Sequence, residues 1–404
     1  MEGLQPATAF ADLAAGVLGN EFFTVLDIGC SGGIDPPFRR FGERLRAFGF
    51  DPNLDEVARL NAAEALPHVT YVPCFVGVPP EVQGAGRMAT GNFFAQNPWG
   101  RLAVRRTTEL RASEFAAASN QRKTEANLWQ ETRLADPAAP VFLPGFVEER
   151  GVDDIDFIKI DVDGPDLLIL RSIDRMLESR NVLGLGVEVN FFGSSDADVH
   201  TFHNVDRFNR FMRMAGFELF DLSMRRSAIG ALPAPYAYAF PAQSAWGRPL
   251  QGDALYLRDL GSPDQVNRAA ALGSAKLLKL AALFSLFGQP DGAAEILTRF
   301  RTRLAERLDV DAALDLLVAQ CGGRSKGMGY AEYMRLFEKD DALFYPAAPR
   351  GSNPGMAPAL APAATTEDLE RQIADLQSEV AALRSSTSWR TTAPLRAVAR
   401  AFGR

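Results

Sequence analysis

The feature that most constrains the fold of this chain is a glycine-rich turn that joins an apolar segment to a second segment ending in an acid. Residues 24–34, TVLDIGCSGGI, place glycines directly after a β-rich run, and Asp51 closes the next apolar segment 22 residues after Gly29. Glycines let backbone N–H groups approach a ligand closely. A carboxylate at the end of the second strand can accept hydrogen bonds from both hydroxyls of a ribose. The sequence therefore predicts a strand, turn, helix and strand that together hold a nucleoside.

The spacing of the glycines separates two kinds of nucleoside ligand. A dinucleotide-binding turn needs G-x-G-x-x-G to seat a pyrophosphate, whereas here Ser31 takes the place of the second glycine and Asp27 precedes Gly29 by two residues. An acid at that position suits a cofactor whose other end is a cationic amino acid, which indicates S-adenosylmethionine. The same pattern disfavours a nicotinamide-dependent oxidoreductase. A glycine turn without any ligand is the alternative, and the placement of Asp51 argues against it.

Composition sets bounds on the class of protein. The chain has 404 residues, of which 47% are apolar, so it can bury a substantial core or form two domains. A formal charge of −7 argues against a general nucleic-acid binder. Cys30, Cys74 and Cys321 form no close pair, which indicates reduced thiols. The amino terminus lacks the basic region of a secretory signal, and the longest apolar run, residues 277–287, is too short to cross a bilayer. We therefore expect a soluble, cytoplasmic protein.

The order of strand and helix signals predicts an α/β fold. Such signals alternate from about residue 20 to 225, which favours βαβ units and a mostly parallel sheet. Residues 78–144 interrupt the pattern and are interpreted as an insertion or lid over the cofactor edge, with a surface loop as the alternative. After the second strand we expect further strands at residues 69–76, from Ile155 onward, and at 182–189, 217–222 and 254–260, with helices at 165–177 and 207–216.

Four acids stand at or near the ends of the expected strands. Asp27 and Asp51 belong to the first two strands, Asp161 follows the run that starts at Ile155, and Glu188 ends the next strand. Open α/β sheets bind ligands outside the carboxyl ends of their strands. We expect these acids to lie at one edge of the sheet.

The second half of the chain changes character. Residues 263–344 predict a helical appendage, in which a hairpin breaks at residues 289–292 and a further helix covers 310–320. A single hairpin is no repeat array, so completion of the core or a dimer contact is favoured over a tetratricopeptide-like unit. Residues 345–364 are rich in Pro and Ala and predict a linker.

Residues 365–404 predict a short coiled coil followed by a basic tail. Apolar residues recur there at alternating spacings of four and three, which is a coiled-coil seam that needs a partner helix. We therefore expect an oligomer or a partner protein. The tail from Arg384 holds five arginines and no acid, so it can lie on an anionic membrane surface at the inner face of the cell membrane, with a solvated tail as the alternative. The seam residues are Leu369, Ile373, Leu376, Val380 and Leu383.

Taken together, these segments resemble the FkbM family of S-adenosylmethionine-dependent methyltransferases. The resemblance rests on VLDIGCSGG, on FGFDPN and above all on DFIKIDVDGPDLLILRSI, and it extends over roughly residues 20 to 260. It implies a Rossmann-like, seven-stranded, mostly parallel sheet with one reversed strand near its edge, in a methyltransferase domain of residues 1–262. The family's usual Glu is replaced by Asp163, and its central glycine by Ser31.

The resemblance also implies a cofactor site and a substrate class. Asp27 and the turn would hold the methionine end of the cofactor, Asp51 the ribose, and Pro52 and Asn53 the adenine side. Family members methylate hydroxyls of sugars and natural products, so an O-methyltransferase acting on a sugar or glycan in surface-polysaccharide biosynthesis is implied. The turn residues carried over in this way are Gly29, Cys30, Ser31 and Gly32.

The sequence offers three candidates for the base that accepts the proton of a hydroxyl. Methyl transfer to a hydroxyl is an in-line displacement that depends on alignment and on such a base. His203 is the preferred candidate and His200 the next, because both follow the strand that ends near Glu188; capping or packing of the following helix is the alternative. Asp161 is the third candidate.

Three carboxylates, those of Asp161, Asp163 and Glu188, are expected to converge on the substrate side. They suit either a divalent metal that binds a sugar diol or hydrogen bonds to substrate hydroxyls. Lys159 alternates with Asp161 on one strand, so an ion pair between them is a third interpretation.

A competing function is a non-catalytic scaffold. Such a protein would keep the cofactor fold and assemble glycan-synthesis enzymes through its helical and coiled-coil regions. Binding of the cofactor without turnover on any glycan would favour it. The segment SWRTTAPLRAVAR resembles tails of bacterial glycosyltransferases, which supports the setting of polysaccharide synthesis.

Overall fold

A computed structural model describes residues 9–83, 133–162, 166–191, 204–227, 248–321 and 327–339 of the chain. The chain divides into two compact units, residues 1–333 and 334–404. Of the second unit, only the end of helix α16 (Tyr330–Lys339) is described. The linker, coiled coil and basic tail predicted for residues 345–404 lie outside the described residues, as does most of the insertion at 78–144.

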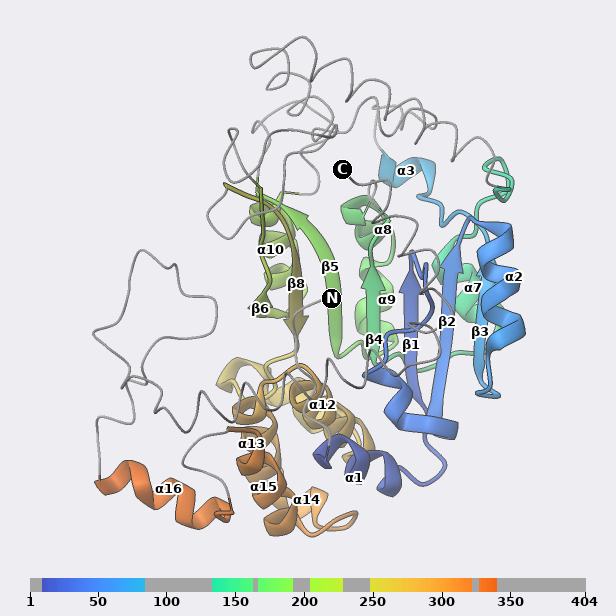
Figure 1. Cartoon of the computed structure of the whole chain (residues 1–404). Helices are drawn as coiled ribbons and strands as arrows, with labels where there is room; N and C mark the ends of the chain where they lie inside the picture. The colour runs from blue at the N-terminus through green and yellow to red at the C-terminus, as the bar shows by residue number, and fades with distance from the viewer. Residues whose placement is uncertain are drawn as a thin grey trace, which may run out of the picture. The chain divides into compact units, whose positions relative to one another are not determined.

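The first unit is built on one eight-stranded sheet (Figure 1). Its strand order is β3-β2-β1-β4-β5-β8-β6, and the short strand β7 also pairs with β8. Strands β3, β2, β1, β4 and β5 run parallel to one another, whereas β8 is antiparallel to β5, β6 and β7. The predicted α/β sheet with one reversed strand near its edge is confirmed, with β7 as an addition. The strands are β1 Phe23–Ile28, β2 Leu45–Asp51, β3 Val69–Pro73, β4 Phe157–Ile160, β5 Gly184–Asn190, β6 Glu218–Leu222, β7 Arg225–Ser227 and β8 Arg248–Leu257.

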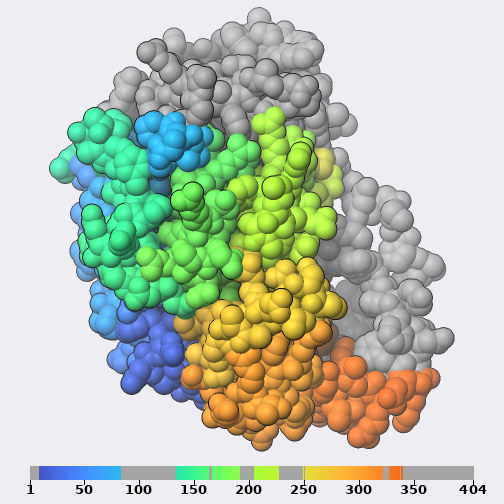
Figure 2. Space-filling model, turned by 180° about the vertical axis from the view of Figure 1, so that it is seen from behind, coloured from blue at the N-terminus to red at the C-terminus, as the bar shows by residue number. Residues whose placement is uncertain are grey.

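Among the described residues, four helices longer than a single turn cover one face of the sheet and share a core with it. The strand residues of this core alternate along each strand, as Leu26 and Ile28 do on β1. In the space-filling view from behind, this part of the chain directly adjoins the later helices drawn in yellow and orange (Figure 2). A single helix was predicted over 165–177, but the structure has two that are separated at Ile173, whose φ is −107° and ψ 11°. The four helices are α7 Leu143–Glu149, α8 Asp166–Ser172, α9 Asp174–Ser179 and α10 Val205–Met214.

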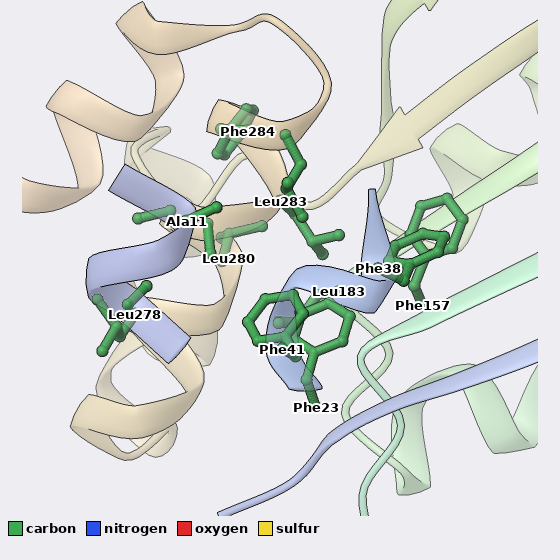
Figure 3. Close-up of a cluster of buried hydrophobic side chains, with 14 of the residues drawn as sticks. Ala11, Phe23, Phe38, Phe41, Phe157, Leu183, Leu278, Leu280, Leu283 and Phe284 are labelled. Carbon is green, nitrogen blue, oxygen red and sulfur yellow. The ribbon is translucent and has the colours of Figure 1, made fainter. Parts of the chain in front are cut away.

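At the amino ends of the strands, the other face of the sheet shares a core with helix α12 (Ser274–Leu286), which is buried on all sides. Every residue from Ala275 to Leu286 is buried, as expected for a helix that is apolar all round. Figure 3 shows Leu280 and Leu283 of α12 near Phe41 and Phe23, which belong to the sheet side of the same core. The predicted hairpin is confirmed as α12 and α13 (Pro290–Arg299). The remaining helices are α1 Ala9–Val17, α2 Leu54–Ala63, α3 Pro80–Gln83, α11 Val266–Ala271, α14 Arg301–Leu304 and α15 Val310–Val318, with 3-10 turns η1 Phe38–Arg44, η3 Pro263–Gln265 and η4 Ala319–Cys321.

Two buried lysines tie α12 to the start of β4. Lys276 Nζ lies 2.7 Å from Asp156 and 2.8 Å from Asp154, and Lys279 Nζ lies 3.2 Å from Asp156. Asp156 also accepts a hydrogen bond from the backbone N–H of Thr24 at 2.7 Å. Buried charges are tolerated when they are paired and hydrogen-bonded in this way. The helical segment and the sheet therefore share a core and an ion-pair network, while the boundaries at residues 262 and 344 stay a prediction.

The later helices lie at the amino ends of the parallel strands, away from the carboxyl ends. Figure 1 shows α1, α12, α13 and α15 gathered at the amino ends of β1, β2 and β4. The acids singled out in the sequence stand at the opposite ends of these strands. Among the described helices, none is both long and apolar enough to cross a membrane.

Candidate functional site

The sheet registers bring charged residues of neighbouring strands side by side on one face. Asp27 on β1 stands opposite Gly49 on β2 and opposite Lys159 on β4, and Lys159 stands opposite Gly186 on β5. The space that a side chain at Gly49 would need is occupied by Cys30 and Tyr71. Asp27 and Lys159 therefore form the centre of a polar row on this face.

A second row follows two residues further along the strands. Because side chains alternate, Asp51, Asp161 and Glu188 project from the same face as the first row. Glu188 stands opposite Asp253 on β8, which extends the row to a fourth strand. The predicted acids are thus brought to one face at the carboxyl end of the sheet, and Asp253 joins them.

The glycine turn follows β1 and therefore lies between Asp51 on β2 and Asp161 after β4. Gly29 has a φ of 89°, and a Cβ there would collide with the carbonyl oxygen of Asp161. Its backbone N–H donates to Phe50 O at 2.8 Å, which ties the turn to the end of β2. Ser31, where the family pattern has glycine, does not have a positive φ. A side chain at position 31 therefore costs no backbone strain.

Asp51 sits at the end of β2 beside the start of α2. Its Oδ1 accepts the backbone N–H of Asn53 at 2.8 Å, and its Oδ2 makes no hydrogen bond within the described part of the chain. Burial raises the pKa of Asp51, with the bond from Asn53 opposing the shift. The side chain of Asn53 caps α2 by accepting the N–H groups of Asp55 and Glu56. Asn53 therefore has a structural task at the position carried over as an adenine contact.

A short segment after the insertion runs along Pro52 and Asn53. Ala135 N donates to Pro52 O at 2.8 Å, and Asn53 forms a bridge with Leu134. The Leu134 side chain is 39% exposed although it is large and apolar. Sequence reasoning missed Leu134 as a neighbour of Asn53, because only the bridge places it there.

Asp27 is the most perturbed acid of the site. It is 2% exposed, and its Oδ1 has no hydrogen-bond partner in the described part of the chain. Lys159 Nζ lies 3.7 Å from this oxygen and 3.8 Å from Asp161 Oδ2. Burial raises the pKa of Asp27 to about 7, although Lys159 opposes the shift. The ion pair proposed between Lys159 and Asp161 is present, and it includes Asp27.

Asp161 is accessible at the edge of the same cluster. About a third of its side chain, 34%, is exposed. Burial of the remainder raises its pKa, while Lys159 lowers it. A raised pKa makes the carboxylate a better proton acceptor than an ordinary aspartate.

The far end of the row holds an arginine that sequence reasoning missed. Arg225 of β7 donates from Nη2 to Glu188 at 3.0 Å and to Asp253 at 2.9 Å. Ser223 Oγ also donates to Asp253, at 3.1 Å. Two carboxylates that face each other across strands repel, and Arg225 offsets this repulsion. No local motif marks Arg225, because its partners lie on other strands.

A further network pins the loop that follows the glycine turn. Arg39 binds Glu64 through two hydrogen bonds of 3.1 and 2.9 Å and donates to Ile34 O at 3.2 Å. Tyr71 OH donates to Glu64 at 3.0 Å and accepts from Ile34 N at 3.3 Å. Burial disfavours the charged Glu64, but its hydrogen bonds, that from Arg39 above all, lower its pKa to about 2. The loop is thereby held by three side chains that carry no recognisable motif.

The remaining candidates cannot be placed. His200, His203 and Asp163 lie outside the described residues. Within the described ranges, no three His, Cys, Asp or Glu side chains are grouped as metal ligands. Glu188, one of the three carboxylates considered for a metal, is bound by Arg225.

The fold and site together define a class of protein. A mostly parallel sheet with a reversed strand between β5 and β6, a glycine turn after β1 and an acid closing β2 is the Rossmann-like arrangement that the resemblance implied. Residues 103–219 match the family model of the methyltransferase FkbM domain. This match confirms the resemblance seen in the motifs. It contains β4 and β5, whereas the glycine turn and Asp51 precede it.

Comparison with solved structures finds methyltransferases of low identity. An S-adenosylmethionine-dependent methyltransferase from Aquifex aeolicus is 10% identical, with 61% of this chain and 88% of that chain covered and a TM-score of 0.24. Precorrin-6y C5,15-methyltransferase from Geobacter metallireducens is 11% identical, with coverages of 61% and 87% and a TM-score of 0.27. A methyltransferase-like structure from Thermoplasma acidophilum is 7% identical, with coverages of 59% and 69% and a TM-score of 0.26. No curated protein matches the chain.

Proposed function

We propose that this chain is an S-adenosylmethionine-dependent O-methyltransferase that acts on a hydroxyl of a sugar or glycan in surface-polysaccharide biosynthesis. The observation that carries the proposal is the placement of Asp27 and Asp51 on one face of the sheet, on either side of the glycine turn. A nucleoside with a cationic amino acid attached needs one carboxylate at each end.

The residues fit such a cofactor. Asp27 Oδ1 is a buried acceptor without a hydrogen bond, and an amino group would supply one. Asp51 has one oxygen free within the described part, which suits a ribose hydroxyl. Pro52 and the exposed Leu134 offer apolar surface to an adenine ring. The bound cofactor supplies a methyl group activated on a sulfonium sulfur.

The substrate side favours neutral hydroxyls. Glu188 and Asp253 accept hydrogen bonds and Arg225 donates them, within one hydrogen-bonded group of side chains. Donors and acceptors placed together in this way suit vicinal hydroxyls, which are both. The guanidinium is already shared by two carboxylates, so an anionic acceptor group is less favoured. The described residues supply no grouped ligands for a divalent metal, and the proposal does not need one.

Proton removal falls to Asp161 or to His203, with His200 as the third candidate. The partial exposure and the raised pKa of Asp161 support this residue as the base. The histidines rest on sequence position alone. A hydroxyl loses its proton to such a base as the methyl group is transferred.

Cofactor binding is tested by calorimetry with S-adenosylhomocysteine. Asp51→Ala should weaken binding about 10- to 100-fold, because it removes hydrogen bonds to a charged acceptor worth about 1.5–3 kcal/mol. Asp12→Ala is the matched control, because Asp12 is an exposed acid on α1 that pairs with Arg40. This change should leave the affinity for S-adenosylhomocysteine unchanged. Equal affinity of the wild type and Asp51→Ala would contradict the assignment of the ribose site.

The acceptor is tested by mass spectrometry of surface glycans from cells with and without the protein. A methyl group that disappears with the protein identifies the acceptor. Glycans that are unchanged, from a protein that binds the cofactor, favour the scaffold function instead.

The terminal segment 365–404 is proposed to bind a partner chain or the inner face of the cell membrane. The heptad spacing and the five arginines support this location. Removal of residues 365–404 should lower the number of chains per particle in solution, and an unchanged number of chains would exclude the coiled coil as the determinant of assembly.

A further inference from the structure

The loop between the glycine turn and η1 is pinned, and it carries an acid that no motif marks. Ile34 is held through its N–H by Tyr71 OH and through its carbonyl by Arg39. One residue later, Asp35 O accepts the backbone N–H of Phe38 at 3.1 Å. The backbone on both sides of the Asp35 side chain is therefore fixed by hydrogen bonds.

The carboxylate of Asp35 has a buried oxygen without a partner. Asp35 Oδ2 is inaccessible to solvent and makes no hydrogen bond within the described part of the chain. Asp27 Oδ1 is likewise buried without a hydrogen bond, and Asp27 as a whole is only 2% exposed. Buried carboxylate oxygens are normally hydrogen-bonded, and each exception calls for an explanation.

The two unpartnered acids both act electrostatically on the ammonium group of Lys159. Burial opposes the charged form of Lys159, but Asp27, then Asp35 and Asp161, outweigh it and raise its pKa. Asp35 also adds to the raised pKa of Asp27. Lys159 stays 3.7 Å from Asp27 and 3.8 Å from Asp161, beyond hydrogen-bond distance of either.

Charge counting shows what the cluster lacks. The carboxylates of Asp27, Asp35, Asp161 and Asp253 all raise the pKa of Lys159, so the acids that act on this ammonium group outnumber it. Two of the carboxylate oxygens in the cluster are buried without a hydrogen bond. A second ammonium group that donates to Asp27 and Asp35 would correct both deficits, because an ammonium has three donors and no acceptor.

We infer that Asp35 is a cofactor-binding residue that, with Asp27, receives the α-amino group of the cofactor's methionine moiety. This inference rests on the proposed function and adds to it a residue that lies outside the glycine motif. It assigns recognition of the amino group to two carboxylates on the two sides of the turn. Charge-assisted hydrogen bonds of this kind are about twice as strong as neutral ones.

The test compares two ligands and three proteins by calorimetry on the full chain. The ligands are S-adenosylhomocysteine and its desamino analogue, in which hydrogen replaces the amino group. Asp35→Asn should weaken S-adenosylhomocysteine about 10-fold or more and the desamino analogue less than about 3-fold. Asp12→Asn, the same chemical change at an exposed acid on α1, should alter neither.

The possible results separate the inference from the proposed function. Equal weakening of both ligands would mean that Asp35 only shapes the loop, and no weakening would mean that it does not touch the amino group; either result overturns the inference. A wild type that binds neither ligand overturns the proposed function and the inference with it. If Asp35→Asn does not fold, as judged by its thermal melt, Asp35→Ser tests the same difference.

Discussion

Cofactor binding should depend on pH through Asp27. Burial raises the pKa of Asp27 to about 7, with Lys159 opposing the shift and Asp35 and Asp161 adding to it. About half of the free protein therefore carries a neutral Asp27 at neutral pH. A cationic amino group beside this carboxyl favours its ionised form and lowers its pKa in the complex. Binding then releases a proton, and affinity increases as the pH rises.

The size of the effect follows from the ionised fraction of the free protein. With a pKa of about 7, Asp27 is ionised in about a tenth of the molecules at about pH 6 and in about nine tenths at about pH 8. The dissociation constant for S-adenosylhomocysteine should therefore fall about 10-fold over this interval. Near neutral pH, about half a proton should be released for each complex formed.

Calorimetric titrations near these two pH values measure both quantities. Two buffers of different ionisation enthalpy report the proton release, because the observed heat then differs between them. Asp27→Asn, which is nearly isosteric and does not titrate, should bind more weakly and lose the pH dependence. A wild-type affinity that is constant over the interval, or higher at the acid end, would refute the assignment of the amino group to Asp27.

Three further measurements test other contacts. Asp27→Asn should stabilise the protein above neutral pH. In the wild type, the folded state keeps the Asp27 proton between the ordinary pKa of 3.8 and a pKa of about 7, whereas the unfolded state loses it. The free energy of unfolding of the wild type therefore falls as the pH rises through that window, by up to about 4 kcal/mol. Urea unfolding in which the wild type is more stable than Asp27→Asn at about pH 8 would contradict this expectation. Asp156→Ala should cost about 3–5 kcal/mol in the same assay, because Lys276 and Lys279 stay buried without it; a loss below about 1 kcal/mol would mean that the pairs add little. His203→Ala and Asp161→Asn each test a base by turnover, with affinity for S-adenosylhomocysteine as the control, and whichever keeps full turnover is not the base.

The sheet was largely predictable because its signals are local. Glycines after an apolar run, and β-branched runs that end in acids, specify strands and turns whatever they pack against. The strand closed by Asp51 and the strand that ends near Glu188 were found in this way. The break between α8 and α9 at Ile173 was not, since no glycine or proline marks it.

The helical segment shows where local pattern reaches its limit. An apolar run that continues around a helix predicts burial, and α12 is indeed buried on all sides. Its two lysines find their partners about 120 residues earlier in the chain, at Asp154 and Asp156. Pairing over such a distance leaves no trace in spacing or composition.

By itself, the sequence determined that this chain forms a glycine turn between two strands and that an acid stands at each end of it, because turns and strands depend on residues that are near neighbours. Only the tertiary structure decided which other groups meet there. Register aligned Glu188 with Asp253, and a pinned loop left one carboxylate oxygen of Asp35, Oδ2, buried without a hydrogen bond. These arrangements arise from packing between distant segments, whose free energy depends on three-dimensional contact and has no fixed spacing along the chain.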